Sequence, residues 1–184
     1  MAIADSREAT FQGSLEGDID VSTLTSRFIE EALRYCEDKA GYIGRDRVAA
    51  ALRSEIPEIH DYFRYALASQ VARYLARLDS SVVAVYIYCY GDAEEEGEER
   101  HCSITMPINI ILHVRRKTAA LSSMVDYLDE QLLGYYKRLV SPYGEKMGSL
   151  LDVQMVDDED IARGVGFGVV LRSSYSKPLR LTLE

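Results

Sequence analysis

The chain has little of what metal centres, disulfide frameworks and membrane spans require. Its 184 residues include three cysteines and three histidines, and these form no Cys-x-x-Cys or His-x-x-x-His pair. So few cysteines predict reduced thiols in a cytoplasmic protein. No apolar run approaches the ~20 residues of a membrane helix. The first residues lack the basic and apolar regions of a secretory signal, so we expect no membrane association.

Positive charge is also scarce. The chain has 21 lysines and arginines against 30 aspartates and glutamates, a net charge of -9 at pH 7. An acidic surface repels the phosphate backbone, so we expect no nucleic-acid partner. The glycine-rich stretch 164–168 lacks the Lys-Ser/Thr of a phosphate loop, and we expect a flexible bend there.

What the chain does have is a helical first half. Residues 1–20 show no sustained period and are predicted to be a flexible tail. Residues 21–79 are predicted to be a helical segment, with amphipathic helices starting near Leu24 and covering Arg45–Arg53 and Glu58–Leu78. From residue 80 onward, strand-like runs alternate with helical segments, and residues 80–184 are predicted to form an α+β core.

The second half contains four strand-like runs. They cover about 82–90, 103–114, 150–156 and 178–183, and a helix capped by Thr118 separates the second from the third. We therefore predict an α+β fold, with a small mixed or antiparallel sheet of about four strands and helices packed on it. Pro107 lacks an N–H, which predicts an edge position or a bulge in the second strand.

The first two runs are joined by an acidic loop, and their layout resembles the core of polymerase-beta-like nucleotidyltransferases. In that family a strand ends in Gly-Ser, the next strand carries Asp-x-Asp, and a third strand supplies another aspartate. The resemblance covers about residues 58–184. It implies a site in which carboxylates hold two metal ions that bridge a triphosphate.

The matching positions here have lost most of those ligands. Gly91-Asp92 stands where Gly-Ser would be, and Pro107-Ile108-Asn109 replaces Asp-x-Asp, while Asp152 keeps the third aspartate. One carboxylate cannot hold two Mg²⁺ ions, so the resemblance implies a degenerate site with no catalytic residues, no bound metal and no cofactor. The carboxylates of the loop, from Asp92 to Glu99, could bind Mg²⁺ or Ca²⁺ weakly, although such runs are usually solvated.

Three functional readings follow. The first is a non-catalytic nucleotidyltransferase-like domain that binds a protein partner or forms a homodimer, with Tyr35 and Tyr62 on the candidate helical contact. The second is a divergent metal-dependent transferase with relocated ligands drawn from Asp92, 94–99 and Asp152. The third is an unrelated regulatory α+β protein. A structure can test whether Asp92, Asn109 and Asp152 meet in one cleft.

Overall fold

The computed structural model describes residues 21–88, 104–174 and 178–183. In chain order the elements are α1 (Val21–Ala40), α2 (Arg45–Arg53), α3 (Pro57–Leu78), β1 (Val82–Ile87), β2 (Ile108–Val114), α4 (Ala119–Val140), η1 (Tyr143–Lys146), β3 (Leu151–Asp157), α5 (Asp158–Arg163), α6 (Gly168–Arg172) and β4 (Leu179–Arg180). The α+β fold with four strands and an N-terminal helical segment is therefore confirmed. No helix of the described ranges is long and apolar enough to cross a bilayer.

The four strands form one mixed sheet in the order β3-β2-β1-β4. β1 pairs antiparallel with both β2 and β4, whereas β2 and β3 run parallel because α4 carries the chain back between them. β2 is therefore a central strand, and β3 is an edge strand among the described elements.

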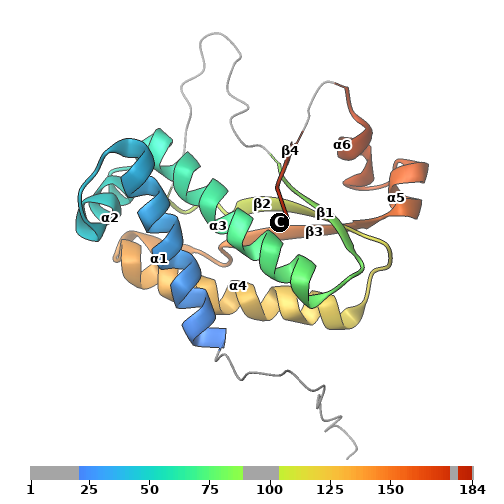
Figure 1. The fold of residues 1–184 in the computed structure, drawn as a ribbon, viewed down its shortest axis with the longest axis horizontal. Helices are drawn as coiled ribbons and strands as arrows, with labels where there is room; N and C mark the ends of the chain where they lie inside the picture. The colour runs from blue at the N-terminus through green and yellow to red at the C-terminus, as the bar shows by residue number, and fades with distance from the viewer. Residues whose placement is uncertain (1–20, 89–103, 175–177, 184) are drawn as a thin grey trace, which may run out of the picture.

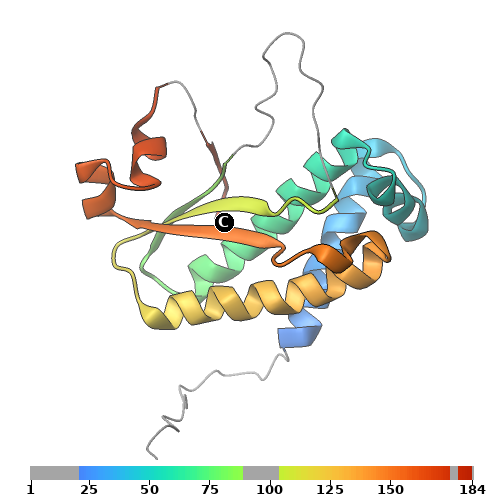
Figure 2. The same ribbon diagram turned by 180° about the vertical axis from the view of Figure 1, so that it is seen from behind.

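Alternation along the strands separates the two faces of the sheet. Ile108, Ile110 and Leu112 of β2 belong to the main hydrophobic core, with Val85 and Ile87 of β1 beside them. This face is covered by helices. The intervening residues of β2 point to the opposite face, and α5 and α6 lie at one end of the sheet (Figure 2).

The helical layer is built on α3, which contacts β1 and β2 and also packs along α1 (Figure 1). α1 in turn contacts α4. The apolar stripes of these amphipathic helices supply the buried contacts, including Phe28 and Leu33 of α1 and Phe63 and Leu67 of α3. The Thr118 hydroxyl accepts the Leu121 N–H at 3.2 Å, so the predicted cap of α4 is confirmed.

Two sequence predictions need correction. Pro107 lies before β2, not within it, and β2 is central, so neither an edge position nor a bulge accommodates the proline. The strand starts one residue later because only Ile108 has the N–H that bonds to the Leu150 carbonyl, at 2.7 Å. The predicted last strand over 178–183 contracts to the two residues of β4.

The glycine-rich bend connects α5 to α6. Gly164 ends α5 with φ of 62°, and Gly166 also has a positive φ, of 52°. Gly168 is held so close to α5 that an added Cβ would lie 2.5 Å from the Asp160 carbonyl oxygen. These glycines form the bend that folds α6 back on α5 in a compact arrangement.

Candidate functional site

The structure brings together two of the predicted site residues. Asn109 on β2 and Asp152 on β3 are register partners on neighbouring parallel strands. Both line a small hollow of about 80 Å³ on the face of the sheet away from the main core. Gly91 and Asp92 lie outside the described residues, as do the acidic loop and residues 1–20, so the structure tests the three-residue cluster only through Asn109 and Asp152.

The Asp152 carboxylate is engaged by a neighbour within this hollow. Gln154 Nε2 donates a hydrogen bond to Asp152 Oδ1 at 2.8 Å. The rest of the wall is mainly apolar and includes Tyr88 and Phe167, whose ring centroids are 5.8 Å apart at a near-perpendicular angle. Among the described residues, Asp152 is the only charged one that lines the hollow, and its carboxylate already has a hydrogen-bond donor.

A metal centre finds little support in the part of the chain that the structure describes. No three His, Cys, Asp or Glu residues are grouped there in a way that could hold an ion. His113 is engaged elsewhere, with Nε2 2.8 Å from Asp158 Oδ1 at the start of α5. Lys117, which follows β2, forms an ion pair with Asp160 of α5. These two pairs anchor α5 to the end of β2.

The outer edge of β3 is a second feature near this site. The Ile108 N–H bonds to the Leu150 carbonyl, and this bond fixes the hydrogen-bonding pattern along β3. The even-numbered residues direct their backbone N–H and C=O toward β2. The odd-numbered residues direct these groups outward, away from the sheet. At one end the outward Leu151 N–H is accepted by Asp129 Oδ1 of α4 at 2.6 Å. At the other end the Asp157 N–H is accepted by Asp160 Oδ2 at 3.2 Å.

The middle of that edge is open. Val153 and Met155 are the two remaining outward positions of β3, and no described residue pairs with their N–H and C=O groups along the edge. Their side chains are half-buried, on the core side of the sheet. A short apolar segment of strand is thus left between two aspartates that occupy the ends of the edge.

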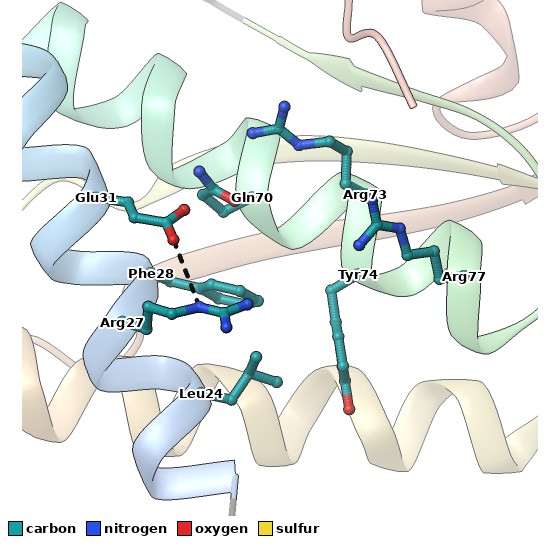
Figure 3. Close-up of a pocket in the computed structure, with 8 residues that line it drawn as sticks. All are labelled: Leu24, Arg27, Phe28, Glu31, Gln70, Arg73, Tyr74 and Arg77. Atoms are coloured by element: carbon teal, nitrogen blue, oxygen red, sulfur yellow. Dashed lines mark ion pairs between the residues drawn. The ribbon is translucent and has the colours of Figure 1, made fainter. Parts of the chain in front are cut away.

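A groove lies between α1 and α3, at residues that no sequence pattern had singled out as a site. The two helices are antiparallel neighbours, since Phe28 contacts Tyr74 at one end and Tyr35 contacts Tyr62 at the other. A hollow of about 290 Å³ opens at the first end, lined from α1 by Leu24, Arg27, Phe28 and Glu31, and from α3 by Gln70, Arg73, Tyr74 and Arg77 (Figure 3).

Three arginines face this hollow, and their charges are unevenly matched. Arg27 Nε lies 3.4 Å from Glu31 Oε1, one turn along α1. Arg73 and Arg77 come from α3, and Arg77 extends toward α1 (Figure 3); no carboxylate of the described ranges forms an ion pair with either. The only sequence signal was Arg73-x-x-x-Arg77, a spacing that puts both on one face of a helix.

A second hollow, also of about 290 Å³, continues the groove past Glu31, Gln70 and Arg73 toward Tyr35 and Tyr65. These two tyrosine rings are 5.8 Å apart. Burial raises the pKa of Tyr35, and the neighbouring Tyr65 adds to that rise. Tyr35 and Tyr62, expected on an outer helical contact, instead face each other between α1 and α3.

Comparison with known proteins adds no assignment. The chain matches no protein-family model, no curated protein sequence and no solved structure. The resemblance to nucleotidyltransferases therefore stays a prediction drawn from the residues.

Proposed function

We propose that the protein is a non-catalytic domain with a nucleotidyltransferase-like core, and that it acts through protein binding, first of all by forming a homodimer. The observation that carries this proposal is the open centre of the β3 edge, at Val153 and Met155. Unpaired strand edges are templates for another strand.

The edge suits a second copy of the same strand. An antiparallel pair related by a two-fold axis near Gln154 would place Val153 opposite Met155 of the other copy. The outward N–H and C=O groups of both residues would then be paired. Asp129 and Asp160 already occupy the two ends of the edge, so they limit the pairing to this short central window.

The non-catalytic part of the proposal is supported by the sheet hollow. Its single carboxylate, Asp152, accepts a hydrogen bond from Gln154, and Asn109 supplies a neutral side chain beside it. Two-metal phosphoryl chemistry needs several oxygen ligands around each cation. We expect isothermal titration to show no tight, metal-dependent binding of nucleoside triphosphates. A low-micromolar dissociation constant that requires Mg²⁺ would favour the divergent transferase instead.

Light scattering coupled to size-exclusion chromatography tests the dimer. We expect twice the 20.7 kDa chain mass at micromolar concentration, and a single-chain mass for Met155→Lys, since a charged side chain on an edge opposes strand pairing. Val169→Lys is the control for the added charge, because Val169 is an exposed apolar residue on α6, away from the β3 edge. A single-chain mass for the unmodified protein up to ~100 μM, where a contact of about 5.5 kcal/mol would populate dimer, would contradict the proposal.

A further inference from the structure

Like charges gather in the α1–α3 groove without an explanation in the fold. Arg73 and Arg77 are four residues apart on one helix, a spacing at which equal charges repel. The hollow they face is lined by three arginines and one glutamate, a net formal charge of two positive, in a chain whose net charge is -9. Such a cluster costs stability unless an anion is bound.

The three arginines line one hollow from two helices. Arg27 extends from α1 toward α3 and Arg77 extends from α3 toward α1, whereas the Arg73 guanidinium extends past Gln70 along the groove (Figure 3). Glu31 lies beside Arg27, which leaves the side of Arg73 and Arg77 as the position for an anion. Planar guanidinium forks bind the tetrahedral oxygens of a phosphoryl group through paired hydrogen bonds.

Apart from Gln70, the other described residues that line the hollow are apolar or aromatic. Phe28 is buried, and its ring meets Tyr74 edge-on at 5.9 Å. Leu24 contributes an aliphatic surface on the same side. The volume of about 290 Å³ is at the lower end of the roughly 300–1,000 Å³ typical of small-molecule sites. It leaves room beside an anion for a small organic group.

From this arrangement we infer that the groove between α1 and α3 binds the phosphoryl group of a small phosphate monoester, held by Arg73 and Arg77 together with Arg27, with the organic part against Phe28 and Tyr74. The site needs no metal ion and lies among the helices, apart from the sheet hollow. It does not depend on the proposed dimer.

Titration with phenyl phosphate and with inorganic phosphate tests the inference, by isothermal calorimetry at an ionic strength kept constant with sodium chloride. We expect saturable binding of phenyl phosphate with a dissociation constant below about 1 mM. Tighter binding of phenyl phosphate supports the ester as drawn. Equal binding of the two supports the phosphoryl site and removes the role of the aromatic wall.

Variants connect the binding to the named arginines. Arg73→Gln/Arg77→Gln should weaken phenyl phosphate binding at least ten-fold. Arg47→Gln/Arg116→Gln, which removes the same charge from exposed arginines on α2 and after β2, should leave it unchanged. The first variant should melt no lower than the unmodified protein, because neither arginine has an ion pair within the described ranges.

The pH dependence distinguishes a phosphoryl site from adsorption of an aromatic ring. A phosphate monoester gains its second charge near pH 6 while arginine stays charged, so binding should strengthen several-fold between pH 5.0 and 7.5. Absence of saturation at 10 mM phenyl phosphate, equal losses in both double variants, or affinity independent of pH would each overturn the inference.

Discussion

The hollow on the sheet and the groove between α1 and α3 differ in whether their charged side chains have partners. In the sheet hollow the one carboxylate, Asp152, is paired with Gln154, and the space measures about 80 Å³. In the groove two arginines share a hollow of about 290 Å³ without a partner carboxylate among the described residues. At the position where the family resemblance predicted a degenerate site, the carboxylate has a hydrogen-bond donor. The charges without an ion-pair partner among the described residues lie instead in the groove, where no family motif pointed.

The largest loss of stability should come from removing Asp129, which holds the start of β3 against α4. Asp129 accepts the N–H groups of Leu150 and Leu151, at 2.8 and 2.6 Å. Asp129→Ala leaves two buried donors without a partner, each costing about 1–3 kcal/mol. We expect a loss of about 2–4 kcal/mol in the free energy of unfolding, measured by urea denaturation.

The control for that variant is Asp126→Ala, an exposed carboxylate one turn earlier on α4. It should change stability by no more than about 0.5 kcal/mol. A loss below about 1 kcal/mol for Asp129→Ala would mean that the start of β3 does not depend on this contact.

A second negative charge in the sheet hollow should make that site unfavourable, as the two neighbouring arginines do in the groove. Asn109→Asp places a second carboxylate next to Asp152 on the neighbouring strand. Since like charges repel across neighbouring strands, we expect a loss of about 1–2 kcal/mol at pH 7, measured by thermal denaturation. The loss should shrink at acid pH and in millimolar Mg²⁺. Asn109→Ala, which adds no charge, should show neither dependence.

A buried histidine gives the helical layer a pH-dependent stability. His60 Nε2 donates to the Leu52 carbonyl at 2.9 Å, and burial lowers the pKa of the imidazole. The neutral form is therefore favoured in the folded state, and its contribution is lost as pH falls below the unfolded pKa of about 6.5. From pH 7 to 5.5 we expect the free energy of unfolding to fall.

The same unfolding measurement on His60→Gln isolates this contribution, since the other titrating groups are common to both proteins. The difference in unfolding free energy between the two should narrow as pH falls. A constant difference across that interval would show that His60 binds protons equally in the folded and unfolded states.

The smallest effect should come from the groove. Arg77→Gln removes one of two like charges and should raise stability by about 0.2–0.5 kcal/mol in low salt. Arg163→Gln is the opposite case, because Arg163 Nη1 lies 2.9 Å from Glu159 Oε1 on α5, and it should lower stability slightly. Calorimetric melting with and without 0.5 M salt measures both. A loss of stability in Arg77→Gln would mean that Arg77 has a structural role.

Cys36 illustrates what the spacing of neighbouring residues can predict. It lies on the apolar stripe of α1 and is fully buried, and burial raises the pKa of the thiol to about 12. The helices over Arg45–Arg53 and from Thr118 onward were predictable for the same reason, since period and caps are written in neighbouring residues. The boundary at Pro107 was misjudged because strand order, which made β2 central, is not a local property.

The sequence alone determined most helix and strand types, the acidic balance and which residues stand at the positions that the family resemblance singles out, because these depend on residue identity and short-range spacing. Tertiary structure decided which residues meet. The parallel register of β2 and β3 brought Asn109 beside Asp152, and the antiparallel packing of α1 on α3 brought Arg27 to Arg73 and Arg77, about fifty residues away along the chain. Long-range contacts of this kind follow from how separate apolar faces are buried together, which no local pattern encodes.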